Sequence, residues 1–533
     1  MTIPRYLISF DSSKLPLIFT DVLVVGGGIA GLRAAIESGK YGKVLLITKD
    51  SFTECNTAYA QGGIASHIDD KNLVSTHIKD TMDNGQELNN PHLVQLIIKK
   101  GVENIKELIK WGVIFDKHGD KYDLAREGGH RLARILHAGG DKTGQELLRA
   151  LLDKARKTPN IELKDNIFSI DLLTDGKNSC SGILVYQKST KSFIIIRSNK
   201  TILATGGAGQ IYRETTNPNI ATGDGVSMAY RAGANVEDME FMQFHPTALY
   251  VAGAVRALIS EAVRGAGGLL VDKNRKRFMK DYHPMEELAP RDIVSRSILD
   301  QMRKTNDTSV YLDVSHLGEK KVKARFPGLY QLCQNFGINI AKDLIPVRPS
   351  AHYMIGGVKI KPNGATNLPN LFAAGECVSS GFHGANRLGS NSLLEGLVIG
   401  AICGKSAGEA LDKRSFEPLN ISHIKPYLPT DSMNLADARN SLRSLMWRLV
   451  GIERDKSSLI EALRKIDFWN SYILPKTFDT PEGWELQNML IFSRLTAQSA
   501  LQRTESRGVH YRIDFPKTDD KNWKTHILLN IKD

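Results

Sequence analysis

The clearest pattern of apolar and polar positions lies near the start of the chain, in TDVLVVGGGIAGLRAAIESGKYGKVLLITK. A short β-branched run predicts a buried strand, the residues after the glycines follow a helical period, and a second apolar run predicts another strand. Gly26, Gly28 and Gly31 stand between the first strand and the helix. In that context the first glycine allows a tight turn, the second lets the backbone approach a pyrophosphate, and the third lets helix and strand pack closely. The segment therefore predicts a nucleotide-binding βαβ unit.

Two more apolar runs indicate that the nucleotide is a large one. TILATGGAG, from residue 201, and NLPNLFAAGEC, from residue 367, each have the pattern of a buried strand that ends in small residues, where the backbone comes close to a ligand. An NAD site has an acid after its second strand, but Lys49 and Asp50 stand there. The separated strands and the missing acid favour FAD, held by a discontinuous domain, over NAD.

Helical spacing of apolar residues recurs in two later segments. Val294, Ile298 and Met302 would bury one face of a helix. Pro290 suits the first position of that helix, because a proline lacks the donor that would be unsatisfied there, so Arg291 sits on a fixed helix end. Nearer the C-terminus, WELQNMLIFSRLTAQSALQR predicts a helix of a small bundle, with one apolar face made by Leu486, Met489, Leu490, Ala497 and Leu501.

The C-terminal part of the chain follows LDKRSFEPLNISHIKPYLPTD, a segment with the prolines and serines of a linker. Beyond it, ESRGVHYR could pack the bundle against the rest of the protein through Arg507 and Arg512, or could form a surface for a partner. Packing is the simpler interpretation. We find no internal repeat and no low-complexity segment.

Composition narrows the class of protein. Hydrophobic residues make up 41% of the 533 residues and charged residues 24%, which is ordinary for a soluble globular chain. The net charge of +12 is spread along the chain and not gathered into arms, so it argues against a nucleic-acid partner and suits a small dianionic substrate. The apolar run GLVIGAICG is too short to cross a bilayer, and no secretory leader is recognisable, so we expect a cytoplasmic protein without a membrane partner.

Cysteine usage points the same way. The five cysteines form no C-x-x-C pair, so we expect neither a metal site nor a disulfide framework; they are Cys55, Cys180, Cys333, Cys377 and Cys403.

Several motifs carry a specific resemblance, in the same order along nearly the whole chain. They are NTAYAQGGIA (56–65), FHPTAL (244–249), SEAVRGAGG (260–268), ELAPRD (287–292), SAHYMIGGV (350–358), HGANRLGSNSLLEGLVIG (383–400) and RTESRGVHYRIDFP (503–516). With them the chain resembles the succinate dehydrogenase, fumarate reductase and L-aspartate oxidase flavoprotein family. The resemblance implies an α/β fold, with a Rossmann-like discontinuous FAD-binding domain (1–239 and 349–412), an inserted α+β capping domain (240–348) and a C-terminal helical bundle (413–533).

Two positions distinguish members within this family. Succinate dehydrogenases carry a histidine that bonds covalently to the flavin, where this chain has Asn56, so we expect non-covalent FAD. In AREGGH the chain has Glu127 where the dicarboxylate dehydrogenases usually have an apolar aromatic residue, and L-aspartate oxidases resemble it in that glutamate. Taken alone, Glu127 would be interpreted as a solvated loop acid; in this motif it predicts recognition of a substrate ammonium.

The resemblance also implies roles for other residues. His245, Ser260, His352 and Arg387 would hold the carboxylates of the substrate. An isolated histidine is more often structural, but the HP and AHY contexts favour ligand binding. Arg291 would donate or accept a proton beside the flavin. Because guanidinium rarely loses its proton, that role needs a relay, and Glu261 and Arg264, three residues apart on one helix face, would provide it.

The expected cofactor contacts come from six places along the chain. They are Gly26, Gly27, Gly28, Ile29, Gly31, Lys49, Asn56, Thr57, Ala58, Tyr59, Ala60, Gln61, Gly62, Gly63, Asp224, Glu376, Ser392 and Leu393. Glu376 could supply the acid that is missing after the second strand, and the segment from Gly384 to Gly396 is expected to start a helix at the flavin ring.

By this resemblance the chain would oxidise L-aspartate to iminoaspartate with FAD, which is reoxidised by O₂, giving hydrogen peroxide, or by fumarate. The reaction would be the first step of NAD biosynthesis, with functional coupling to quinolinate synthase. A soluble fumarate reductase or succinate dehydrogenase-type flavoprotein is the alternative, although it would have little use for Glu127. A non-catalytic flavin-binding scaffold would require the set of histidines and arginines to be accidental.

Overall fold

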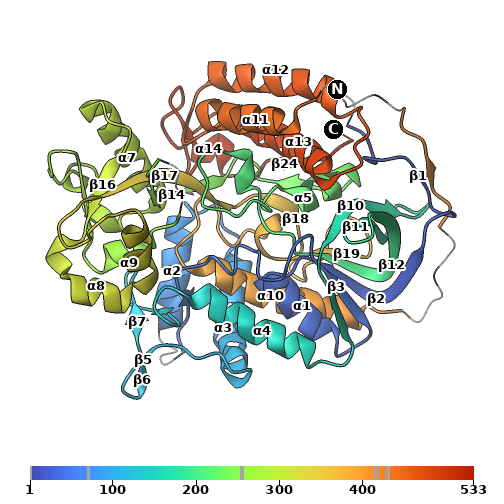
Figure 1. Cartoon of the computed structure of the whole chain (residues 1–533), viewed down its shortest axis with the longest axis horizontal. Helices are drawn as coiled ribbons and strands as arrows, with labels where there is room; N and C mark the ends of the chain where they lie inside the picture. Colours follow the sequence, from blue (N-terminus) through green and yellow to red (C-terminus); the bar gives the residue numbers. More distant parts are fainter. Residues whose placement is uncertain are drawn as a thin grey trace.

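The fold is that of a computed structural model of the chain, which describes residues 3–68, 73–252, 257–412, 416, 419–426, 428 and 433–532. Figure 1 shows three parts: a sheet with helices packed on it, a separate lobe at the left, and a layer of helices along the top.

The central sheet contains the predicted βαβ unit. Strands β2 (Leu17–Val25) and β3 (Val44–Ile47) are parallel neighbours, and α1 (Ile29–Ser38) connects them. The strand order is β10-β11-β12-β2-β3-β9, and β19 (Leu371–Ala373) also pairs with β12 (Ser192–Leu203). The apolar runs from 201 and 367 are therefore neighbours in one sheet, which confirms the prediction of a discontinuous domain.

The other strands of this sheet are β9 (Ile161–Lys164), β10 (Ile167–Thr174) and β11 (Cys180–Gln187). The helices packed near it are α2 (Val74–Asn84), α3 (Pro91–Lys110), α4 (Thr143–Arg156), α5 (Asp224–Arg231) and α10 (Asn391–Glu409). A four-stranded sheet follows the order β20 (Val378–Ser379), β18 (Gly357–Lys359), β13 (Val236–Glu237) and β24 (Leu528–Leu529).

Glycines bring α1 and α10 into close contact. A Cβ added at Gly400 would lie 2.5 Å from the carbonyl oxygen of Ala30, and one at Gly404 would lie 2.3 Å from that of Ala34. The apolar run GLVIGAICG is thus the contact face of a buried helix.

The lobe at the left of Figure 1 is built on the sheet β14-β17-β16-β15. These strands are β14 (Met242–Leu249), β17 (Ile345–Met354), β16 (Val310–Asp313) and β15 (Leu269–Val271), and the helices are α6 (Glu261–Gly265), α7 (Arg291–Thr305), α8 (Glu319–Arg325) and α9 (Pro327–Asn335). The lobe has its own apolar cluster, from Leu249 to Val347. Strand β17 crosses the predicted boundary at 348/349, and the domain boundaries stay a prediction.

Helix α7 begins one residue later than expected. Pro290 is its N-cap, with φ −51° and ψ 146°, and Arg291 is its first helical residue. The extended ψ of Pro290 places this residue outside the helix. Its ring therefore restricts the backbone that leads into the helix and not the first helical turn. Val294, Ile298 and Met302 are buried as predicted.

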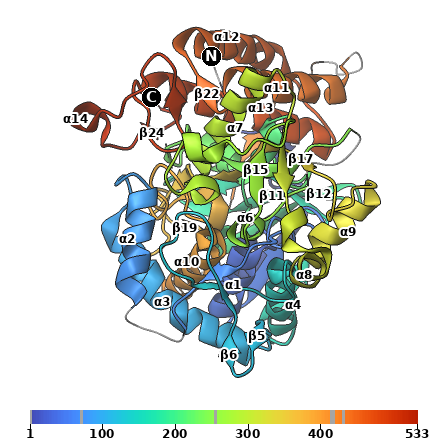
Figure 2. The ribbon, with the colours of Figure 1, turned by 90° about the vertical axis from the view of Figure 1, so that its left-hand side faces the viewer.

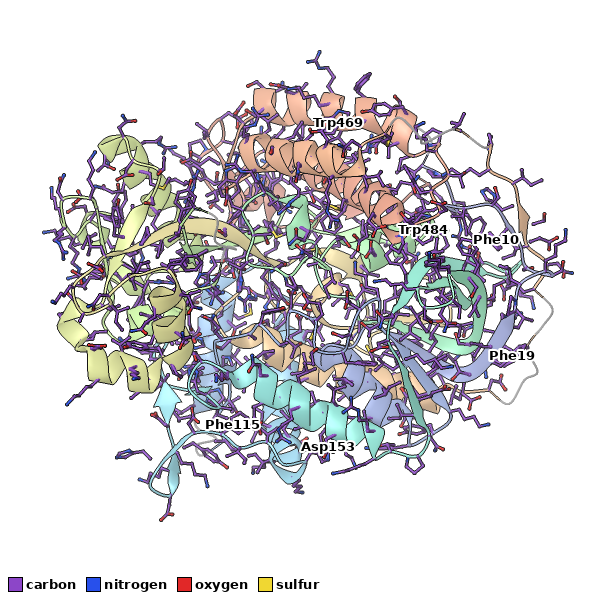
Figure 3. The ribbon with its side chains drawn as sticks, viewed as in Figure 1. Phe10, Phe19, Phe115, Asp153, Trp469 and Trp484 are labelled. Carbon is purple, nitrogen blue, oxygen red and sulfur yellow. The ribbon has the colours of Figure 1, made fainter. Side chains whose placement is uncertain are left out.

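The C-terminal part contains α11 (Leu435–Leu449), α12 (Lys456–Ile473), α13 (Pro481–Gln502) and α14 (Asp520–Trp523). The one-sided pattern predicted for α13 is wrong, since its middle turns are buried on nearly all sides. It lies between the other bundle helices and the central sheet, where Trp484 packs on Phe168 and Tyr186 (Figure 3). Arg507 donates to the carbonyl of Gln86, so this segment packs on the FAD-binding part.

Contacts of Arg512 stay inside the C-terminal part, with Asp514 and the carbonyl of Ala500. Residues 413–415, 417, 418, 427 and 429–431 of the predicted linker at 411–431 lie outside the described residues. Its described portion contains β21 (Ser422–His423), which pairs with β1 (Phe10–Asp11). The remaining short strands are β4 (Ile64–Ala65), β5 (Lys117–His118), β6 (Lys121–Tyr122), β7 (Leu124–Ala125), β8 (Ile135–Leu136), β22 (Glu453–Arg454) and β23 (Tyr511–Arg512).

Candidate active site

One large cavity lies between the central sheet and the lobe. It offers about 1670 Å³ free of protein atoms, including space open to solvent, so a cofactor larger than a drug-sized molecule fits. Its lining contains most residues expected to bind cofactor or substrate: Gly26, Gly27, Gly28, Ile29, Lys49, Asn56, Thr57, Tyr59, Ala60, Gln61, Gly62, Gly63, Glu127, Asp224, His245, Ser260, Glu261, Arg291, His352, Glu376, Arg387, Ser392 and Leu393. Gly31, Ala58 and Arg264 lie behind this lining.

The glycine turn has the geometry that a bound dinucleotide needs. Gly26 has φ +118°, and a Cβ there would lie 2.1 Å from the carbonyl oxygen of Ala204. A Cβ at Gly31 would lie 1.9 Å from the carbonyl oxygen of Gly26, so helix and turn touch directly. At Gly28 the nearest atom to an added Cβ is Thr57 Oγ1, at 3.2 Å. The backbone of Gly28 is therefore accessible from the cavity.

Two acids on the cofactor side are already engaged by protein groups. Glu376 Oε2 accepts a hydrogen bond from Asn56 Nδ2 at 2.9 Å, and its Oε1 accepts from the Met354 amide at 3.1 Å. Burial raises the pKa of Glu376 to about 7. Asp224 lies 2.6 Å from the Lys49 ammonium.

Three charged side chains of the lobe contact one another in a row that reaches the cavity. Glu261 Oε2 lies 2.7 Å from Arg291 Nη2, and its Oε1 accepts from Arg264 Nη2 at 3.0 Å. All three side chains are buried. Burial opposes the charge of Glu261, but the two arginines outweigh it and hold the pKa of Glu261 below its usual range. The structure thus brings Arg291, Glu261 and Arg264 into contact in this order, and their role as a proton relay stays a prediction.

Two histidines line the same cavity on the paired strands β14 and β17. The rings of His245 and His352 are 5.1 Å apart, centroid to centroid. Burial, followed by the nearby arginines, lowers the pKa of both imidazoles well below the usual value, so both are neutral at pH 7. The amide of Thr247 donates to His245 Nδ1 at 3.3 Å, which leaves the proton on Nε2. His352 Nδ1 is hydrogen-bonded to Thr216 Oγ1 at 2.9 Å.

Gln243 joins the two arginines of the cavity. Its Oε1 accepts from Arg291 Nη1 at 3.2 Å and from Arg387 Nε at 3.3 Å. Arg387 also stacks on the ring of Tyr353 at 4.4 Å and donates to Ser392 Oγ at 2.8 Å. Burial lowers the pKa of Arg387 to about 10, so it stays cationic at pH 7. The sequence analysis missed Gln243, although it directly precedes the FHPTAL motif.

Glu127 is the acid that lies closest to Glu261 in this site. Its Oε2 accepts from Ser390 Oγ at 2.8 Å, whereas its Oε1 is buried and has no hydrogen-bond partner among the described residues. Burial, and then the charge of Glu261, raises the pKa of Glu127. Gly389 lies between the two acids, because a Cβ there would be 2.9 Å from Glu127 Oε2 and 3.1 Å from Glu261 Oε2.

Ser260 has a second task in the structure. It is the N-cap of α6, and its hydroxyl accepts from the Ala262 amide at 3.3 Å. Because the hydroxyl only accepts in this bond, its own proton remains free to donate. Ser260 lines the cavity, so a bound ligand could receive that hydrogen bond.

Comparison with known proteins identifies the family. The family described as FAD binding domain matches residues 21–393, and the family described as fumarate reductase flavoprotein C-term matches residues 439–533. The chloroplastic L-aspartate oxidase of Arabidopsis thaliana is 41% identical, over 96% of this chain and 83% of that protein. The L-aspartate oxidase of Pseudomonas aeruginosa is 38% identical, over 93% of this chain and 95% of that protein. The chain belongs to the L-aspartate oxidase family.

Solved structures agree with this membership. A variant of Escherichia coli quinol fumarate reductase FrdA has a TM-score of 0.90 at 33% identity, covering 97% of this chain and 95% of that one. Mycobacterium smegmatis Sdh1, in complex with UQ1, has a TM-score of 0.83 at 34% identity, covering 96% and 92%. For this member of the L-aspartate oxidase family, the predicted fold class and FAD as cofactor are confirmed.

Two further observations concern membrane-spanning helices and the cysteines. Within the described residues, no helix combines the length and the apolar composition that a bilayer span requires. All five cysteines are free thiols in the structure.

Proposed function

We propose that this protein oxidises L-aspartate to iminoaspartate, and that the residues lining the cavity bind the substrate and carry out the reaction. The observation that carries the proposal is the buried Oε1 of Glu127, a cavity-lining residue, which has no hydrogen-bond partner among the described residues. An ammonium would satisfy that oxygen, and a substrate without nitrogen would leave it unpaired, at the cost of a desolvated charge.

The carboxylates of the substrate match the rest of the cavity. Arg291 and Arg387 line the cavity and Arg264 lies behind it against Glu261, so three arginines stand beside the two acids Glu127 and Glu261, a balance that suits a dianion. Arg387 binds one carboxylate through two N–H groups of its planar guanidinium group. The neutral His245 donates through Nε2, and the hydroxyl of Ser260 and the ring of His352 complete the set of donors, as proposed from the sequence.

The reaction removes a hydride from the α-carbon and one proton. FAD, when bound, would supply the hydride acceptor, with O₂, giving hydrogen peroxide, or fumarate as the final electron acceptor. Arg291 can take up the substrate proton only after it has passed its own proton to Glu261 and on through Arg264, along the contacts described above, so its neutral form is short-lived. Closure of the lobe over the cavity would exclude water during this step.

The residues fit FAD at the cofactor end as well. The open backbone of Gly28 would hold the pyrophosphate, and the N-terminus of α10, at Ser392 and Leu393, would hold the flavin ring. Asn56 carries no imidazole nitrogen and is hydrogen-bonded to Glu376, so attachment is non-covalent in this proposal.

The product imine is unstable in water, and a consuming enzyme close by would limit its loss. We therefore propose functional coupling to quinolinate synthase, in the first step of NAD biosynthesis.

Anaerobic reduction of the purified protein tests the function. L-aspartate is expected to bleach the visible flavin band, succinate is expected to leave it unchanged, and acid precipitation should release the flavin into the supernatant. Bleaching by succinate and not by L-aspartate would favour the succinate dehydrogenase-type alternative. A colourless protein that stays colourless with added FAD would contradict both.

A further inference from the structure

The Lys49 ammonium has no N–H group left for the cofactor. A lysine has three donors, and all three are used by protein: Thr222 Oγ1 at 2.8 Å, Asp224 Oδ2 at 2.6 Å and Glu485 Oε1 at 2.7 Å. Lys49 nevertheless stands after β3, at the end of the strand where a dinucleotide site normally has the acid for the adenosine ribose. Two acids from elsewhere in the chain, Asp224 and Glu485, instead accept hydrogen bonds from the ammonium at this place.

One of these acids comes from the C-terminal helix α13. Glu485 lies on its second turn, and its other oxygen, Oε2, accepts from Arg439 of α11 at 3.2 Å. Asn488, three residues further along α13, donates to Asp224 Oδ1 at 2.8 Å. Both ends of the Lys49–Asp224 pair are therefore held by the same helix.

Helix α13 is itself fixed against the sheet. Trp484, next to Glu485 in the chain, is buried between Phe168 and Tyr186, with ring centroids 5.5 and 5.2 Å away (Figure 3). Phe168 also lines the cavity, and the Lys49 ammonium lies 5.7 Å from its ring. The position of Glu485 is thus set by packing and not by a flexible loop.

Charge explains why the arrangement is stable. Burial opposes the charge of Lys49, but Asp224 and Glu485 outweigh it and raise the pKa of the ammonium. Asp224 keeps spare capacity: two oxygens have about four acceptor sites, and three are used, by Lys49, Thr222 and Asn488. Asp224 lines the cavity, whereas Glu485 is not among the lining residues.

We infer that Glu485 and Asn488 of the C-terminal helix are positioning residues for the adenosine half of FAD, and that Asp224, aligned through Lys49, is the acid that accepts the ribose hydroxyl. The C-terminal helical part then completes the cofactor site as well as the hydrophobic core. This inference rests on the proposed role of Lys49 and Asp224 in cofactor binding.

FAD and FMN binding to the apoprotein test the inference, because FMN lacks the adenosine half. For Glu485→Gln we expect about tenfold weaker FAD binding, measured by flavin fluorescence, since a charge-assisted hydrogen bond that orders Lys49 is weakened. FMN binding should change less than about twofold. Glu482→Gln, on the exposed side of the same helix, removes the same charge and should leave both affinities unchanged.

Two results would overturn the inference: an unchanged FAD affinity in Glu485→Gln, or an equal loss for FAD and FMN, which indicates a general structural defect. If that variant does not fold, Glu485→Asp provides the test, because it keeps the charge but withdraws it from Lys49, and the same selective loss is expected. Bleaching of the wild-type flavin by L-aspartate is measured in a separate experiment. A negative result in the FAD and FMN binding test therefore does not contradict the proposed function.

Discussion

At the scale of single residues, the lone oxygen of Glu127 makes the most specific prediction. Glu127→Gln keeps the shape and the bond from Ser390 but removes the charge that pairs with an ammonium. We expect kcat/KM for L-aspartate to fall by at least about 30-fold, as for loss of a buried ion pair. Fumarate reduction with an artificial electron donor should fall by less than about threefold. Equal losses in the two assays would assign Glu127 a structural role.

Arg291 makes a different prediction, because it lies on the proton path. Arg291→Leu should retain FAD but lose turnover by several orders of magnitude, measured under saturating L-aspartate, and it should lower the melting temperature, because Glu261 loses a buried partner. Lys304→Leu, an exposed change near the end of the same helix, is the matched control and should be fully active. Substantial turnover in Arg291→Leu would reject the assignment of Arg291 to proton transfer.

Residues also differ in how far the sequence could predict them. Gly26, Gly31 and the Glu261–Arg264 pair follow from local turns and helix spacing, and the structure places them as such. The role of Gln243 could not be predicted in this way, because it depends on two arginines that are 48 and 144 positions away. Only the folded chain brings their guanidinium groups to one carbonyl oxygen.

At the scale of elements, the last strand is tied down by a titratable pair. His526 Nδ1 lies 2.6 Å from Asp238 Oδ2, beside the pairing of β24 with β13. Burial opposes the charge of His526, but Asp238 outweighs it and raises the pKa of the imidazole. A raised folded-state pKa stabilises the protein below the unfolded value of about 6.5 and loses this effect as the pH rises through the folded value.

The expected outcome is a pH-dependent difference in melting temperature. His526→Gln should be less stable than the wild type at about pH 6, and the difference should narrow by about pH 9. His92→Gln, at an exposed position, serves as the control. A difference that stays constant with pH would mean that the ion pair contributes nothing.

Element boundaries illustrate a limit of periodicity. The sequence pattern predicted the start of α7 to within one residue, but its one-sided interpretation of α13 was wrong. Apolar spacing identifies a helix that has a solvent-facing side. It cannot show that polar residues such as Gln487 and Asn488 are buried too, with hydrogen bonds to other elements.

At the scale of the whole molecule, the C-terminal helices and the central sheet share one apolar cluster, whereas the lobe has its own. Figure 2 shows α11, α12 and α13 gathered at the top of the molecule, and the lobe contacts the C-terminal part through α7. Arg303 of α7 pairs with Glu453 across this contact. The bundle is therefore not an independent appendage.

Deleting residues 433–533 should remove cofactor binding and soluble yield together, because it exposes the rings around Trp484. Size-exclusion chromatography and FAD titration measure both. A chain cut once within 411–431 keeps every residue and should remain associated and bind FAD. A truncated chain that is monomeric and yellow would contradict the shared core.

Strand β17 has a consequence for any opening of the cavity. Its first half pairs with β16 in the lobe, while Ala351 is hydrogen-bonded to the backbone at Glu214 and His352 to Thr216, in the FAD-binding part. A rotation of the lobe would then turn about this continuous strand. His352 would keep its place beside the cofactor while Arg291 moved away with the lobe. A departing product would therefore lose contact with Arg291 before it lost contact with His352.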